Sequence, residues 1–167
     1  MKIITKIRLI LYVSAIILVS GCAAHQPIPD NYQGPLSNIK DSITGVSNTR
    51  VHIFQLKKVD GRQVQTSSAA TSEKSFGAGK NIYPAIQQRQ VPAQTSTLEI
   101  EGLTYVAMPI LALGGNMHKI SGKIEVNLMP DQSYTVKGVL SETYSAVWLE
   151  DEAGAIISQK LEEGVKP

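Results

Sequence analysis

Short stretches in which apolar and polar residues alternate are the feature that most constrains the fold of this chain. Leu98 and Ile100 alternate with Glu99 and Glu101, and residues 120–128 confine their apolar side chains to even-numbered positions. A period of two places successive side chains on opposite faces of a β-strand. The pattern therefore predicts strands with one face on a core and the other face in water.

Turn residues separate these stretches, and no amphipathic helix is expected after residue 35. About eight or nine short strands are predicted, over residues 39–44, 51–56, 82–90, 98–101, 108–113, 120–128, 134–137, 144–149 and 155–161. Many short strands with frequent turns predict an all-β fold. We expect a single small antiparallel β-sandwich of immunoglobulin-like or transthyretin-like type.

Residues 66–81 interrupt the alternation, because they are rich in Ser, Thr, Ala and Gly and contain little apolar surface. Two interpretations are open at this point, a long mobile loop or a loosely paired edge. If the segment has a function, it is a binding loop in which Phe76 is the anchoring side chain.

The N-terminus has the pattern of an export signal. Lys2, Lys6 and Arg8 precede an apolar run over residues 9–19, which is too short to span a bilayer and suits a signal peptide. The segment Leu18-Val19-Ser20-Gly21-Cys22 resembles the lipobox of bacterial lipoproteins.

The resemblance implies cleavage before Cys22 and attachment of lipid to the thiol of this residue, the only cysteine in the chain. Two or more acyl chains give stable anchoring. Ala23, rather than aspartate, follows the cysteine, which in enteric-type cells implies an outer-membrane lipoprotein facing the periplasm. The expected organisation is a signal peptide over residues 1–21, an acylated, proline-rich tether over 22–35 and a β-sandwich over 36–167.

The charge distribution argues against nucleic-acid binding. The formal net charge is +2, but the first 21 residues contribute three basic and no acidic side chains. From Cys22 onward, 13 basic residues face 14 acidic residues. Binding of a phosphate backbone needs a concentrated basic face, which this composition does not supply.

The motifs in this sequence that suggest a cofactor or a metal are incomplete. Gly77-Ala78-Gly79-Lys80 looks like part of a phosphate-binding loop, but Lys74 stands where that motif needs glycine, and Asn81 replaces the hydroxyl that binds Mg²⁺. The three histidines, His25, His52 and His118, lack the spacing of paired metal ligands. No cofactor and no metal are expected.

Catalytic groups are equally hard to find. No serine lies in a Gly-x-Ser-x-Gly turn. Glu99 and Glu101 share one strand face opposite the apolar residues, so they are interpreted as a solvated surface rather than as a glycosidase pair. Residues 150–152 are interpreted as a charged turn without calcium-ligand spacing. The sequence therefore predicts a protein that is not an enzyme.

Trp148, the only tryptophan, has two interpretations. Between Val147 and Leu149 it fits a core position. If the strand alternates, however, Trp148 points outward near Tyr144 and forms an apolar patch for a partner.

These observations predict a non-enzymatic lipoprotein of the cell envelope that docks another envelope component through sheet edges or loops. The alternative is a module that binds a small ligand or a glycan in a pocket near residues 66–81. Residues 51–57 (VHIFQLK) also resemble a segment of the anchoring lipoprotein of type VI secretion systems. The oligomeric state does not follow from the sequence.

Overall fold

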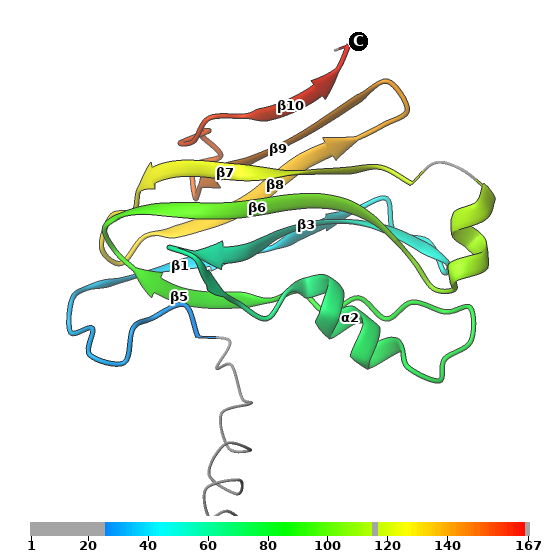
Figure 1. The fold of residues 1–167 in the computed structure, drawn as a ribbon, viewed down its shortest axis with the longest axis horizontal. Coiled ribbons are helices and arrows are strands. Elements are labelled where there is room, and N and C mark those ends of the chain that lie inside the picture. The colour runs from blue at the N-terminus through cyan, green and yellow to red at the C-terminus, as the bar shows by residue number, and fades with distance from the viewer. Residues whose placement is uncertain (1–25, 115–116, 166–167) are drawn as a thin grey trace, which may run out of the picture.

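The computed structural model describes residues 26–114 and 117–165 as two β-sheets packed face to face (Figure 1). The all-β sandwich predicted from the alternation is confirmed. Sheet A has the strand order β10-β9-β8-β1-β5, and sheet B has the order β2-β3-β6-β7, with β4 paired to β3. All strand pairs are antiparallel except β1 with β8, which is parallel.

The strands are short apart from two long central ones in sheet B. Sheet A consists of β1 (Leu36–Lys40), β5 (Gln88–Pro92), β8 (Ser133–Leu140), β9 (Tyr144–Asp151) and β10 (Leu161–Gly164). Sheet B consists of β2 (Ser42–Thr44), β3 (Arg50–Val59), β4 (Arg62–Gln63), β6 (Thr95–Val106) and β7 (Lys119–Asn127).

The main core lies between the sheets and follows the predicted alternation. Leu98, Ile100, Ile124 and Val136 are among the buried side chains of this core, and the largest is Phe54 at the centre of β3. Gly138 on β8 makes room for this ring, because a Cβ atom at Gly138 would collide with the Phe54 side chain. The alternation was therefore sufficient to locate the core-facing side chains of these strands.

A single strand over residues 39–44 was expected, and the structure divides it. β1 belongs to sheet A and β2 to sheet B, so the chain crosses between the sheets at Asp41. Asp41 is completely buried and pairs with Arg89 on β5, with Oδ1–Nη1 and Oδ2–Nη2 distances of 2.8 Å. Leu56 and Ser67 also donate hydrogen bonds to this carboxylate. The crossing is thus stabilised by side-chain or backbone partners from three separate segments, β3, α2 and β5.

Residues 66–81 contain a helix, so both interpretations of this segment were wrong. Helix α2 (Ser67–Ser75) begins at Thr66, whose hydroxyl accepts a hydrogen bond from Ala69 N, as in a standard N-cap. Its buried residues, Ser67, Ala70 and Thr71, have helical spacing but are small or polar. The helix therefore lacks the apolar stripe by which a sequence normally reveals one.

Three hydroxyl groups join α2 to the extended segment that follows it. Ser67 accepts a hydrogen bond from Gln87 N, Thr71 from Ala85 N and Ser75 from Tyr83 N, at 2.8–3.0 Å. Four residues of helix rise about 6 Å and two residues of strand about 6.6 Å, so the two spacings match. We call Ser67, Thr71 and Ser75 the hydroxyl ladder.

The hydroxyl ladder explains why the strand expected over residues 82–90 was only partly correct. Residues 83–87 direct alternate N–H groups to the helix instead of to a neighbouring strand, and β5 begins only at Gln88. The strand expected over residues 155–161 was likewise wrong in extent, because it reduces to an isolated bridge at Ile156 before β10.

Candidate interaction surfaces

The strand expected over residues 108–113 is instead a short 3₁₀ helix, η2 (Pro109–Gly114), at one end of the sandwich. Ala107 N donates to Thr49 O, and beyond this bond the chain leaves sheet B. Pro109 cannot donate to a sheet ladder, which favours the end of the strand just before it. Met108, Ile110 and Leu113 of this apolar run therefore stay outside the core.

Apolar side chains around η2 are open to solvent. Leu113 is 84% exposed and Ile110 is 66% exposed, while Met108 and Met117 on either side are each more than 40% exposed. We call Met108, Ile110, Leu113 and Met117 the apolar tip. Exposed apolar groups gathered on one segment are typical of contact sites for other molecules. This site could not be recognised from the sequence, because an apolar run of six residues is typical of a buried strand.

Trp148 lies on the outer face of sheet A, while its neighbours Val147 and Leu149 are buried in the core. The Trp148 side chain is half-buried, and its Nε1 donates a hydrogen bond of 2.7 Å to Glu150. The Lys160 ammonium lies 4.4 Å from the ring centroid and covers the ring in a cation–π contact. Of the two interpretations of Trp148, the second describes its orientation: the strand alternates, and Trp148 faces outward.

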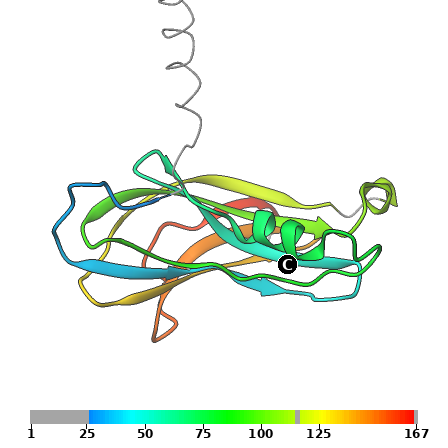
Figure 2. The same ribbon diagram turned by 90° about the horizontal axis from the view of Figure 1, so that it is seen from below.

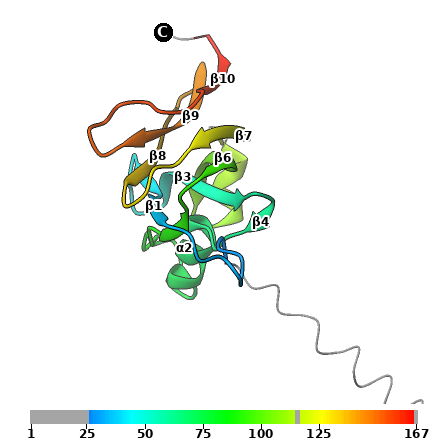
Figure 3. The same cartoon turned by 90° about the vertical axis from the view of Figure 1, so that its left-hand side faces the viewer.

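Tyr144 contributes little open surface, because it is buried and its hydroxyl lies 2.6 Å from Glu162. Phe76, by contrast, is 92% exposed just after the end of α2. In Figures 1 and 3, α2, which ends just before Phe76, lies beneath the sandwich, whereas β9, which contains Trp148, lies in its upper part. The structure does not bring the three predicted interaction residues into one surface.

Glu99 and Glu101 were interpreted as a solvated pair, which is wrong for Glu101, a residue only 5% exposed. The amide of Gln55 donates to Glu101 Oε2 at 2.9 Å, and Lys119 lies 2.8 Å from Glu101 Oε1. Although burial by itself raises the pKa of Glu101, hydrogen bonds from Lys119 and Gln55 and the charge of Lys57 bring that pKa below its ordinary value.

Glu99 lies at the wetter end of the same row of charges. Lys58 is 3.0 Å and Lys57 3.3 Å from its carboxylate, and the hydrogen bond from Lys58 is the main cause of its lowered pKa. We call Glu99, Glu101, Lys57, Lys58 and Lys119 the charged cluster.

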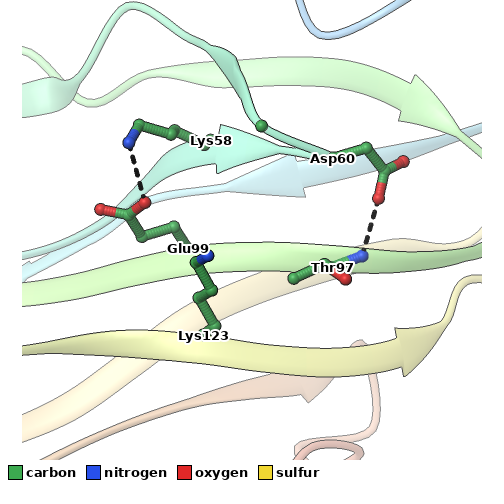
Figure 4. Close-up of a pocket in the computed structure, with 6 residues that line it drawn as sticks. Lys58, Asp60, Thr97, Glu99 and Lys123 are labelled. Carbon is green, nitrogen blue, oxygen red and sulfur yellow. Dashed lines mark hydrogen bonds and ion pairs between the residues drawn. The ribbon is translucent and has the colours of Figure 1, made fainter.

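A hollow of about 480 Å³ lies beside the charged cluster (Figure 4). Its lining residues are Lys58, Asp60, Gly61, Thr97, Glu99 and Lys123. Asp60 shapes one wall, because its carboxylate accepts a hydrogen bond of 2.8 Å from Thr97 N. Another hollow, of about 530 Å³, lies at the start of α2 and is lined by residues 63–66, Ala69 and Glu73. Most of the side chains that line these two hollows are polar or charged, whereas most small-molecule sites are lined mainly by hydrophobic side chains.

His52 and His118 lie on either side of Thr104 across sheet B. Thr104 is the register partner of His52 on β3, and its N–H donates to His118 O at 2.8 Å. Burial, together with the charges of His118 and Arg50, lowers the pKa of His52. Within residues 26–114 and 117–165, no three His, Cys, Asp or Glu side chains form a group able to hold a metal ion. His25 lies outside the described residues.

The predicted signal peptide and Cys22 also lie outside the part of the chain that the structure describes. The description begins at Gln26, and Tyr32 closes a turn by donating its N–H to Pro29 O. Among the described residues, no helix has the length and apolarity needed to cross a membrane.

No protein-family model, curated protein or solved structure matches this chain. The similarity of residues 51–57 to the type VI anchoring lipoprotein is therefore limited to those seven residues. In the structure these residues form most of β3, the strand between β2 and β6, and five of them are buried, four as core side chains and Gln55 beside α2. A buried central strand explains such a pattern without common function.

Proposed function

We propose that this protein is a non-enzymatic lipoprotein of the cell envelope that docks another envelope protein through its apolar tip. The lipobox at residues 18–22 supports anchoring through Cys22, and Ala23 supports an outer-membrane location facing the periplasm. The observation that carries the docking function is the exposure of Ile110 and Leu113 at the end of the sandwich.

The position of the apolar tip suits a tethered docking module. In Figures 1 and 2, residues 26–35 lie at one end of the long axis, and η2 lies at the other end. A partner at the apolar tip would therefore not collide with the segment that leads to the anchor. The exposed groups are unbranched or γ-branched side chains and a β-branched isoleucine, which fit an apolar groove rather than a charged surface.

The alternative function, binding of a small ligand or a glycan, has weaker support. The two hollows described above are lined mainly by polar and charged groups, and in one of them Lys58 and Glu99 already neutralise each other. Apolar walls with a few convergent polar groups would have favoured a ligand.

Site-specific crosslinking in cells tests the proposal. A photoreactive phenylalanine analogue at position 113, in η2, is compared with the same analogue at Val139, which is 44% exposed on β8. We expect a discrete protein adduct at position 113 and none at position 139. The double substitution Ile110→Ser and Leu113→Ser should remove co-purification of the same partner without changing the melting temperature.

Crosslinking at position 139 to the same partner, or undiminished co-purification of the double variant, would refute docking through the apolar tip. The anchor is tested separately, because Cys22→Ala should abolish incorporation of radiolabelled palmitate. Continued incorporation in that variant would refute the lipid attachment site.

A further inference from the structure

The chain between the proposed lipid anchor and the described structure is very short. Gln26, the first described residue, follows Cys22 by four positions. Four residues of fully extended chain span at most about 14 Å. If Cys22 carries lipid, as the proposed function requires, the surface around Gln26 must lie close to the bilayer.

The beginning of the described chain and helix α2 lie on the same side of the sandwich. In both Figure 1 and Figure 3 they are at the bottom of the molecule, whereas β10 is at the top. The two views differ by a turn about the vertical axis, so the separation of α2 from β10 along that axis is the same in both. The chain therefore leads to the proposed anchor from the side of the sandwich that carries α2.

Residues 74–86 give this side a composition suited to a bilayer surface. Phe76 is 92% exposed, and Tyr83 and Ile86 are 49% and 42% exposed. Lys74 and Lys80 flank Phe76 in the sequence, and both are exposed. Aromatic and aliphatic side chains enter the boundary between headgroups and acyl chains, while lysines extend towards anionic headgroups.

The backbone presents Phe76 at the end of α2 rather than against the sandwich. Gly77 and Gly79 adopt positive φ angles of 79° and 64°, which glycine tolerates without strain and which turn the chain away from the helix. Ser75 holds the following segment through its bond from Tyr83 N. Ser75 and Tyr83 are therefore held together, and Phe76 between them is the most exposed side chain of the segment.

We propose that residues 74–86 form a membrane-contact loop that inserts Phe76 into the interface of an anionic bilayer, as a second contact beside the lipid on Cys22. This inference rests on the proposed anchor. It makes the side of α2 the membrane-facing side and directs the long axis, with the apolar tip at its end, along the membrane surface.

Fluorescence of the acylated protein in vesicles tests this contact. Phe76→Cys is labelled with the environment-sensitive dye NBD after acylation has consumed the Cys22 thiol, and the protein is reconstituted in phosphatidylethanolamine and phosphatidylglycerol. Val139→Cys on sheet A is the matched control. We expect a blue-shifted emission, quenched by lipid-borne spin labels, at position 76 and a water-like emission at position 139.

The strength of the contact is measured with protein that lacks acyl chains. We expect the chain from Ala23 onward, produced without the signal peptide and Cys22, to bind the same vesicles weakly. Phe76→Ser in that chain should bind roughly tenfold more weakly still. Replacement of phosphatidylglycerol by phosphatidylcholine should weaken binding as well, because Lys74 and Lys80 lose anionic partners.

The outcomes separate this inference from the anchor. A water-like emission at position 76 in protein that stays with the vesicles through carbonate washing would overturn the membrane-contact loop and leave the anchor intact. Absence of lipid on Cys22 would overturn the anchor, and the membrane-contact loop with it. Equal blue shifts at positions 76 and 139 would also overturn the loop, because they indicate non-specific adsorption.

Discussion

The crossing at Asp41 and the charged cluster both bury a carboxylate, but they hold different parts of the molecule. Asp41 has no exposed surface and is bonded to Leu56, Ser67 and Arg89. These partners lie on β3 in sheet B, on helix α2 and on β5 in sheet A. Asp41 therefore joins three layers of the structure.

The hydrogen-bond and ion-pair partners of Glu101, by contrast, lie in the same sheet as Glu101. Its neighbours Gln55 and Lys119 lie on β3 and β7, which the backbone of β6 already pairs on both sides. How much a buried carboxylate stabilises the fold therefore depends on whether other bonds would still hold its partners together in its absence. Four predictions test this difference, in order of decreasing expected effect.

The largest effect is expected from Asp41→Asn. This change leaves the Arg89 guanidinium, which is only 10% exposed, without its anionic partner. Removing one member of a buried ion pair costs about 3–5 kcal/mol, so the free energy of unfolding should fall by that amount. Urea unfolding followed by Trp148 fluorescence measures the loss, with Asp30→Asn at an exposed position as the control.

If Asp41→Asn fails to fold, Arg89→Lys supplies a milder test of the same contact. Lysine keeps the charge but loses the two parallel hydrogen bonds, so an intermediate loss is expected. A loss no larger than that of Asp30→Asn in either variant would contradict the role assigned to the crossing.

A smaller effect is expected from Thr71→Val in the hydroxyl ladder. Thr71 is fully buried, and valine keeps its shape while leaving Ala85 N–H without an acceptor. An unpaired buried donor costs about 1–3 kcal/mol. Thermal and urea unfolding should show this loss, and Thr71→Ser, which keeps the hydroxyl, should recover most of it. Equal losses in the two variants would mean that packing, rather than the hydrogen bond, is responsible.

Glu101→Gln should cost about 1–2 kcal/mol at neutral pH, because it removes charge-assisted bonds that are partly open to water. The folded pKa of Glu101 lies below its ordinary value of 4.5, so its ionised form stabilises the fold above that pH. This contribution is lost as the pH falls through the folded pKa. The difference in unfolding free energy between wild type and variant should therefore vanish in acid; a difference independent of pH would contradict the charge argument.

The smallest effect is expected from Lys58→Met. The Lys58 side chain is 36% exposed and pairs with Glu99 at the rim of the hollow. Exposed ion pairs contribute about 0.2–1 kcal/mol, and salt screens them. Urea unfolding at low and high ionic strength should show a small loss that disappears in high salt. A loss as large as that of Glu101→Gln would remove the distinction between the two ends of the charged cluster.

The candidate surfaces show where sequence reasoning reached its limit. Phe76 could be identified as exposed, because glycine and polar residues surround it. The apolar tip could not, since a run such as residues 108–113 is compatible with a buried strand until the path of β6 is known. Helix α2 has one signal in the sequence that was not recognised: serine or threonine stands at positions 67, 71 and 75, a spacing close to one helical turn.

The alternating stretches were enough to predict β6, β7 and β8 with the side chains that they bury in the core, and hence a sandwich, because burial of one strand face depends only on a period of two. The sequence also carries the resemblance to a lipobox over residues 18–22, on which the proposed anchor rests. Three features became visible only in the folded chain: Asp41 divides an expected strand, Glu101 is buried and residues 67–75 form a helix. Each of these depends on hydrogen-bond partners 13 to 48 residues away along the chain, and no local pattern encodes which distant segments will meet.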